Sequence, residues 1–401
     1  MRIHGWIVVI GLLVSCVSPA IEPAPADVIQ PTPTLAEATA AASKPAIEVA
    51  SDVPPVNITR HSVPLEEVYF DTFQPINRAV PLSTAQPELI ERLRDAIPPI
   101  HNPKYEPASE AQWLRDDDTV IGYAAGDEAW AYPVRILNYH EIVNERLGGE
   151  DVLISYCPLC FSGIVFSRVL DDQVLTFGNT SALYESDMVM LDYETGSYWW
   201  QVAGQAIVGD LTGKTLTVLP SATTSWGEWK SLHPSTLVLS PDTGFSRRYG
   251  SDSFQQYAEY VNSGNFAFPV SDAGKDPRLL PGETVFAVKI GEEVRGYPIA
   301  QLEGSAIADK VGGQDIVVFT SQGGSLGAAF EPVAADQELS FEIRNEDIID
   351  LETGSVWDMA GRAVSGPLTG QQLIALPSKT SYWFAIVAAE PAITLYQAQE
   401  R

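Results

Sequence analysis

The stretch Glu194-Thr195-Gly196-Ser197-Tyr198-Trp199 has a close counterpart further along the chain, Glu352-Thr353-Gly354-Ser355-Val356-Trp357. Other short motifs recur downstream in the same order and at a nearly constant distance. With their counterparts they are Tyr132-Pro133 and Tyr297-Pro298, Gly148-Gly149 and Gly312-Gly313, Leu211-Thr212-Gly213 and Leu368-Thr369-Gly370, Leu219-Pro220-Ser221 and Leu376-Pro377-Ser378, and Trp226 and Trp383. The recurrence predicts a tandem duplication in which short insertions and deletions fall in loops.

The two predicted copies differ in their reactive side chains. The shared residues are turn glycines, a Tyr-Pro corner and tryptophans, which shape a backbone without doing chemistry. In the second copy Cys157 becomes Ser321, Cys160 becomes Gly324, His140 becomes Gly304 or Ser305, Met190 becomes Ile348, and His233 becomes Glu390. We therefore expect the functional site in the first copy.

Hydrophobic patterning predicts a mainly β chain. A hairpin is expected over 118–134, with further strands over 151–156, 163–169, 173–177, 188–192, 198–202, 206–208 and 215–219. Helices are expected over 87–96, 134–147 and 226–232, the second because apolar residues fall at helical spacing before Gly148-Gly149. The expected fold class is mainly β (α+β), with two tandem homologous β-rich domains, barrel- or sandwich-like, and short helices.

Composition limits the partners of the protein. A chain of 401 residues, 45% of them hydrophobic, can bury a large core and form two domains. It carries 52 Asp and Glu against 24 Lys and Arg, so nucleic acid is not an expected partner. The sequence indicates no particular protein partner.

The N-terminus has the pattern of an export signal. Arg2 and His4 precede an apolar run over 7–14 that is too short to span a bilayer. The run ends in Leu13-Val14-Ser15-Cys16, which resembles a bacterial lipobox and predicts lipidation of Cys16; the alternative is a secretory signal cut near Ala20. Either alternative predicts an extracytoplasmic protein, and lipidation would anchor it to the membrane.

The predicted segments follow from these features. Residues 1–16 are the signal, and 17–64 are a tether rich in Pro, Ala and Thr that cannot form a core. The first repeat domain is expected over 65–245, a connecting segment over 246–280, and the degenerate second domain over 281–397.

Across about 97–278 the sequence resembles domain-of-unknown-function family 3179 of bacteria and archaea. The motifs that carry the resemblance are Ala96-Ile97-Pro98-Pro99, Ala131-Tyr132-Pro133, His140-Glu141-Ile142-Val143-Asn144, Tyr156-Cys157-Pro158-Leu159-Cys160, Leu175-Thr176-Phe177-Gly178, Ser186-Asp187-Met188-Val189-Met190, Glu194-Thr195-Gly196-Ser197 with Trp199 and Gln201, and 226–234. The sequence departs from the family pattern at Phe161-Ser162-Gly163 and over 179–184. The resemblance implies an extracytoplasmic setting and no particular reaction.

The Cys-Pro-Leu-Cys motif allows three interpretations. The first is a soft-metal site in which Cys157 and Cys160 are joined by His140, His233, Met188 or Met190. In a strand, both methionines would face the same side. Thiolate, thioether and imidazole together suit copper, which we expect first, whereas two cysteines with two histidines suit zinc. The histidines could equally be structural, and the methionines could belong to the core.

The second interpretation is a thiol-disulfide redox module, since the spacing is that of redox motifs. Residues 161–169 read as a strand, however, and redox motifs of this kind begin a helix. The third is a local disulfide in a non-catalytic binding or assembly domain. Closing so short a loop would restrict the unfolded chain by only about 1.9 kcal/mol.

Acid-base chemistry has two candidates. Glu141 and Asp187 are acidic, whereas their counterparts near Ser305 and Asn345 are not. The sequence contains no Gly-x-Ser-x-Gly elbow and no phosphate-binding loop, and the recurrence of 194–197 favours a turn there over catalysis. The pattern therefore favours a protein that is not an enzyme.

Overall fold

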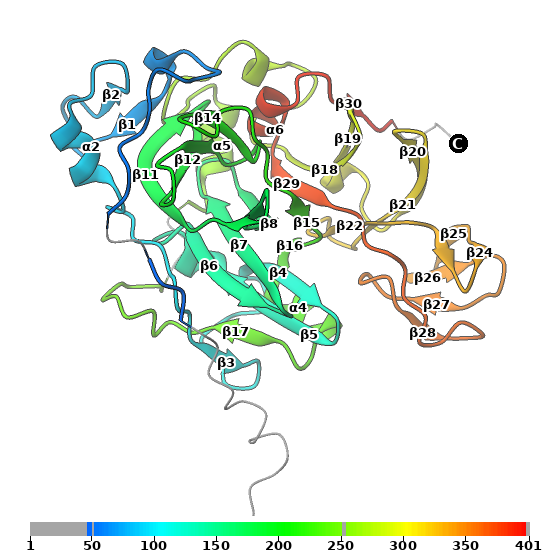
Figure 1. The fold of residues 1–401 in the computed structure, drawn as a ribbon. Coiled ribbons are helices and arrows are strands. Elements are labelled where there is room, and N and C mark those ends of the chain that lie inside the picture. Colours follow the sequence, from blue (N-terminus) through cyan, green and yellow to red (C-terminus); the bar gives the residue numbers. More distant parts are fainter. Residues whose placement is uncertain (1–45, 50–51, 251–253, 398–401) are drawn as a thin grey trace, which may run out of the picture. The chain divides into compact units, whose positions relative to one another are not determined.

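The computed structural model describes residues 46–49, 52–250 and 254–397, which belong to one compact unit (Figure 1). The predicted signal, Cys16 and residues 17–45 of the predicted tether lie outside the described residues. Among the helices that are described, none is long and apolar enough to cross a membrane.

Three large sheets dominate the fold, and none closes into a barrel within the described residues (Figure 1). The first has the order β14-β13-β12-β11-β1-β2, with β14 Gln205–Val208, β13 Tyr198–Trp200, β12 Asp187–Asp192, β11 Phe177–Tyr184, β1 Tyr69–Asp71 and β2 Ala79–Pro81. The second has the order β16-β4-β5-β17-β3, with β16 Ala222–Ser225, β4 Thr119–Ala125, β5 Glu128–Pro133, β17 Leu237–Leu239 and β3 Tyr105–Pro107. The arrangement is sandwich-like, which is one of the two predicted alternatives, barrel and sandwich.

The third sheet contains strands from both halves of the chain. Its order is β30-β19-β18-β29-β8-β7-β6, with β30 Thr394–Leu395, β19 Glu293–Pro298, β18 Thr284–Ile290, β29 Ser378–Tyr382, β8 Ser162–Ser167, β7 Glu150–Cys157 and β6 Ile142–Leu147; β15 Val218–Leu219 also pairs with β8. The halves join where Thr380 of β29 pairs with Gly163 of β8. A methyl group at Gly163 would lie 2.4 Å from Ile121 Cδ1, so only glycine fits this junction without displacing a neighbour.

The order of elements in the first half recurs in the second. Smaller sheets complete the second half: β20 Ala306–Val311, β21 Gln314–Thr320 and β22 Gly327–Phe330; β23 Val333–Ala334 and β24 Gln337–Glu338; and β25 Phe341–Arg344, β26 Asp347–Asp350, β27 Val356–Trp357 and β28 Ala363–Ser365. They follow the order of β6 to β8, the ribbon of β9 Val169–Leu170 with β10 Gln173–Val174, and β11 to β14. This recurrence supports the duplication, which we keep as a proposal.

The repeated Glu-Thr-Gly-Ser stretch forms the same turn in both halves. In the first, Asp192 accepts hydrogen bonds from Thr195 N (2.6 Å) and Trp199 Nε1 (2.9 Å). In the second, Asp350 accepts from Thr353 N (2.6 Å) and Trp357 Nε1 (2.9 Å). The stretch therefore acts as a turn that ties a buried tryptophan to the preceding strand.

Two of the three predicted helices exist. The α4 helix spans Trp226–Leu232, with the Ser225 side chain accepting from Glu228 N at its start. The α2 helix spans Pro87–Leu93 and ends three residues before the predicted end. Other helical segments are α3 Val134–Leu137, α5 Tyr257–Asn262, α6 Trp383–Ala389, and the 3₁₀ turns η1 Leu65–Glu67, η2 Ala273–Lys275 and η3 Ile299–Gln301.

The predicted helix over 134–147 is wrong. Only α3 is helical, and β6 follows after a turn in which Glu141 has φ +58°. Ile142 to Glu145 are all buried, so β6 is covered on both faces and lacks the polar alternation that would have identified a strand. The consequence is that His140 and Glu141 lie in a turn before β6, the last strand of the third sheet.

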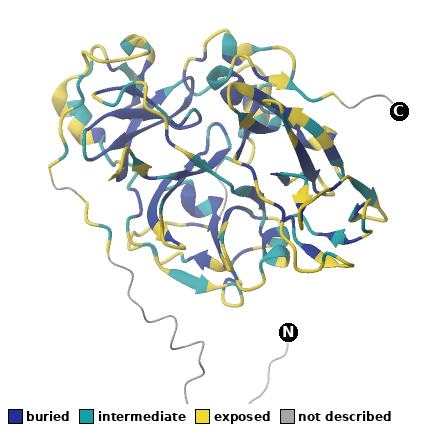
Figure 2. Ribbon diagram, turned by 45° about the vertical axis from the view of Figure 1, so that its right-hand side comes forward, coloured by how far each residue is buried: buried dark blue, intermediate teal, exposed yellow. Residues whose placement is uncertain are grey.

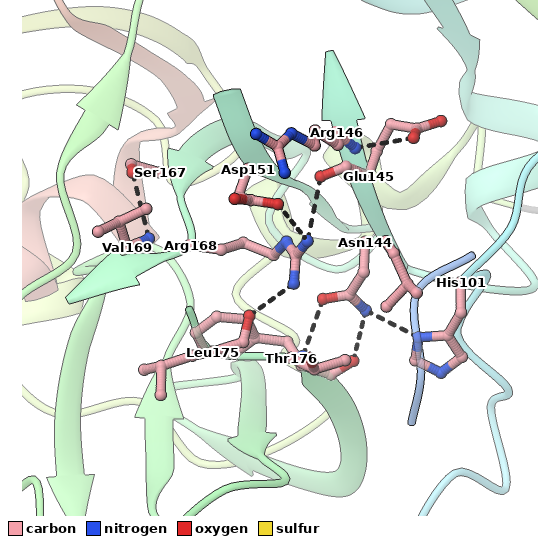
Figure 3. Close-up of polar contacts among 12 residues, drawn as sticks. His101, Asn144, Glu145, Arg146, Asp151, Ser167, Arg168, Val169, Leu175 and Thr176 are labelled. Atoms are coloured by element: carbon pink, nitrogen blue, oxygen red, sulfur yellow. Dashed lines mark hydrogen bonds and ion pairs between the residues drawn. The ribbon is translucent and has the colours of Figure 1, made fainter. Parts of the chain in front are cut away.

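Buried polar side chains tie β6 to β11 and the residue after β8 to β7 (Figure 3). Asn144 Nδ2 donates to the Phe177 carbonyl and its Oδ1 accepts from Phe177 N, both at 2.8 Å. The guanidinium of Arg168 donates to the Leu175 carbonyl (2.8 Å) and pairs with Asp151 (3.2 Å). In Figure 2 the buried positions follow the central strands, while the exposed ones follow the loops. Asn144 thus fixes the strand that follows Glu141 to the strand that carries Asn179.

Candidate metal centre

The two cysteines lie in the tight connection between β7 and β8. Cys157 is the last residue of β7, and Cys160 N donates to the Cys157 carbonyl (3.3 Å). The Cys160 carbonyl accepts from Tyr382 N (2.8 Å) and from Ser381 Oγ (3.1 Å). The second half of the chain therefore fixes the backbone of the cysteine loop.

Cys157, Cys160 and Asp187 form a buried group whose potential ligand atoms all lie within 4.8 Å of one another. Both cysteines are free, and their Sγ atoms are 3.1 Å apart. The Cys160 thiol donates to Asp187 Oδ1 (2.9 Å), and Val202 N donates to Asp187 Oδ2 (2.8 Å). Two sulfurs and a carboxylate of known orientation thus converge on one point, as metal coordination requires.

Burial controls the charges in this group. It raises the pKa of Asp187 to about 6 and raises the pKa of both thiols above the ordinary value, most strongly for Cys160. Lys379 of β29 is also buried, which lowers its pKa to about 8, and its Nζ donates to the Val202 carbonyl (2.8 Å). A protonated lysine therefore lies one peptide away from the Asp187 carboxylate.

A second set of polar groups borders this centre. Glu141 Oε2 accepts from Asn179 Nδ2 (2.6 Å), and the same amide is 3.5 Å from Met188 Sδ. Burial, with a smaller effect of the Asp187 charge, raises the pKa of Glu141 to about 8, so this side chain is largely a neutral acid at pH 7. Glu141, Asn179 and Met188 share the wall of a cavity of about 270 Å³ with Cys157.

An irregularity in β11 directs Asn179 toward Glu141. The register with β12 shifts between Asn179 and Ala182, which leaves two residues without partners opposite them. Bulges of this kind re-aim side chains next to functional sites. The bulge falls within 179–184, where the sequence departs from the family pattern.

Strained backbone surrounds the centre. Residues with left-handed φ include Glu141 (+58°), Phe161 (+53°) and Ser181 (+57°). Each is a site residue or lies within two positions of one, and none is a glycine or an asparagine. Such conformations cost on the order of 1–3 kcal/mol each and cluster at functional sites.

The structure does not bring the predicted histidines into this group. The ring nitrogens of His140 are occupied, because Nδ1 donates to the Pro98 carbonyl (2.7 Å) and Nε2 accepts from Tyr249 Oη (2.6 Å). His233 follows α4, where its ring lies 4.2 Å from that of Trp229 and borders a different cavity of about 830 Å³. Both histidines therefore lie outside the group of Cys157, Cys160 and Asp187 and pack against other parts of the fold.

The methionines and carboxylates fall in different places. Met188 borders the cavity beside Cys157, whereas Met190 is buried opposite Trp199 in the sheet. Asp187, expected only as an acid-base candidate, is the third member of the buried group. Asn179 and Lys379 were not predicted. The departure from the family pattern over 179–184 hinted at the first, and nothing in the sequence pointed to the second.

The cysteines do not have the surroundings of a thiol-disulfide exchange motif. They lie between two strands, without the helix start that lowers a thiol pKa, and their exposed fractions are 1% and 0%. Their raised pKa values leave them as thiols, which are poor nucleophiles.

Comparison with curated proteins and with solved structures finds no match. A family model described as "Protein of unknown function (DUF3179)" matches residues 94–392. The match extends beyond the 97–278 over which the motifs were recognised and includes most of the second half. Because it covers well over half of the sequence, the chain belongs to the DUF3179 family of proteins of unknown function.

Proposed function

We propose that this protein binds one metal ion, zinc in preference to copper, through Cys157, Cys160 and Asp187. The observation that carries the proposal is the convergence of two unbridged sulfurs and a carboxylate within 4.8 Å in a fully buried position. Thiolate sulfur with carboxylate oxygen is a donor set that zinc accepts readily. Copper(I) prefers sulfur without a hard oxygen ligand, so the carboxylate shifts the preference from copper to zinc.

The surroundings support a charged centre. Bound zinc would replace the two thiol protons, and Lys379 would balance part of the negative charge of two thiolates and a carboxylate. The hydrogen bond from Val202 N fixes the orientation of Asp187, as outer partners do in metal sites. Three protein ligands leave one tetrahedral position open, unlike the four of a structural zinc site.

A copper(I) site is the second candidate, and Met188 is its specific support. The thioether of Met188 lies on the same cavity wall as Cys157, so two thiolates and a thioether could serve copper(I). The variant Met188→Leu separates the two ions, because it removes only the thioether. Zinc affinity should be unchanged in this variant, whereas copper(I) affinity should fall at least tenfold if copper is the ion.

The test of metal binding uses the whole chain with Cys16 replaced by serine, so that Cys157 and Cys160 are the only thiols. Protein kept reduced and freed of metal should take up about one zinc per chain. Cys157→Ser and Asp187→Asn should each weaken zinc binding by at least about tenfold, measured by competition with a chromophoric chelator. Asp127→Asn is the matched control, because Asp127 is exposed on the β4–β5 turn.

Two outcomes would reject this function. One is a folded, reduced protein that takes up neither zinc nor copper(I) while its thiols cycle with a measurable midpoint potential, which would favour the redox module. The other is zinc uptake that Cys157→Ser and Asp187→Asn leave unchanged. Circular dichroism of each variant verifies that a loss of binding is not a loss of fold.

We also keep the extracytoplasmic, membrane-anchored location as a proposal. Its support is the sequence alone: the apolar run that ends in Leu13-Val14-Ser15-Cys16 and the tether that follows. In such a location thiols are readily oxidised, and a bound metal would protect this pair from disulfide formation.

A further inference from the structure

A cavity of about 270 Å³ is lined in part by Cys157 and has no assigned role. This volume is many times what one water molecule needs, so the cavity has room for a small organic molecule. Of the three proposed metal ligands, Cys157 lines this cavity and the other two do not. A molecule in the cavity would therefore approach the metal from the Cys157 side.

The walls of the cavity are mostly apolar. Ile97, Leu159, Leu183 and Phe268 line it together with two further phenylalanines. The polar groups on the wall are engaged with one another, as in the hydrogen bond between Glu141 and Asn179. The interior therefore favours an apolar molecule with few polar atoms.

The mouth of the cavity does not select anions. Arg78 lines it, but its guanidinium pairs with Asp71, with Nε at 3.1 Å and Nη2 at 2.9 Å from Oδ2. The same guanidinium lies 5.2 Å from the Phe268 ring centroid. Phe73 at the mouth is 51% exposed, so the rim is apolar and its one cation is neutralised.

We infer that the cavity admits a small, uncharged molecule with an apolar body and a single nitrogen or sulfur donor, which occupies the fourth position on the metal. The inference rests on the proposed function, because the donor atom needs a metal to bind. An apolar body gains by leaving water for these walls, and a charged one would lose its hydration without a partner. Nitrogen and sulfur are donors that a zinc ion accepts readily beside thiolates.

The test uses the whole chain loaded with cobalt(II), whose visible absorption reports the ligands of a zinc site. Addition of 4-phenylimidazole should change the visible bands in a saturable manner, and the charged imidazole-4-carboxylate should bind at least about tenfold more weakly. Ile97→Trp should fill the cavity and weaken the binding of 4-phenylimidazole at least about tenfold, while cobalt uptake stays the same. Ile76→Trp is the matched control, because Ile76 is 79% exposed.

The outcomes separate the two proposals. Cobalt uptake with bands that 4-phenylimidazole leaves unchanged would overturn the cavity inference and leave the metal site intact. Equal binding of 4-phenylimidazole to Ile97→Trp and to the unaltered protein would also overturn the cavity inference and leave the metal site intact. Absence of any cobalt or zinc uptake would overturn both. If Ile97→Trp does not fold, Leu183→Phe fills the same cavity from another wall and takes its place.

Discussion

Replacing Glu141 by glutamine should remove a pH dependence of stability. The Glu141 pKa rises from 4.5 to about 8 on folding, because the side chain is buried. Between these values the folded state holds a proton that the unfolded state has lost, so stability falls as pH rises through this window. Glutamine resembles the protonated acid and can still accept from Asn179, so Glu141→Gln should not show this loss.

The magnitude follows from the two pKa values. Each pKa unit corresponds to about 1.4 kcal/mol, which gives a loss of about 3 to 4 kcal/mol for the native protein between pH 5 and pH 8. Relative to the native protein, the free energy of unfolding of the variant should therefore rise by at most about 3 to 4 kcal/mol between pH 5 and pH 8. Groups that do not interact with Glu141 contribute equally to both proteins and cancel in the difference.

The assay is urea unfolding of the reduced, metal-free protein at several pH values from 5 to 8. Glu150→Gln is the matched control, because Glu150 is exposed at the start of β7, and its curve should run parallel to that of the native protein. Parallel curves for Glu141→Gln and the native protein would refute the reasoning. So would a variant that is less stable than the native protein at pH 8.

Three further predictions concern other parts of the chain. Asn144→Ala leaves the buried N–H and C=O of Phe177 without their side-chain partners and should lower the free energy of unfolding by about 2 to 4 kcal/mol in urea titrations. His233 has its pKa lowered to about 4 by burial, so stability should fall as pH drops from 6.5 to 4; His233→Phe should reduce this fall by about 2 kcal/mol in thermal melts, and an unchanged acid profile would contradict it. Cys16→Ser should move the protein from the membrane fraction to the soluble fraction of a bacterial host, and retention in the membrane would contradict the predicted lipid anchor.

Local chemistry made part of the fold predictable. Helix α4 begins at Trp226 directly after Ser225, whose side chain caps it, so what starts this helix lies in neighbouring residues. The error over 134–147 has the opposite origin. Strand β6 is buried on both faces by partners distant in sequence, and the apolar residues over 134–147 fall at helical spacing.

The candidate site was also predictable only in part: its residues could be recognised, but their positions in space could not. Cys157, Cys160 and Asp187 were recognisable because the second half has no such residues at the corresponding positions. Their convergence depends on the pairing of β11 with β12 and on the turn before β8, and a sequence does not state such pairings. The histidines were misleading because rare residues with metal-binding nitrogens can also serve as buried hydrogen-bonding groups, as His140 does with Pro98 and Tyr249.

The hydrogen bonds from Tyr382 and Ser381 to the Cys160 carbonyl have a consequence for the order of events during synthesis. A growing chain contains both thiols long before the ribosome reaches the strand that sets the shape of their loop. Until residues 381 and 382 have been made, the loop lacks these two contacts and the thiols remain open to oxidation. Metal loading would then follow the synthesis of β29, and a product truncated before β29 would carry the cysteines without a finished centre.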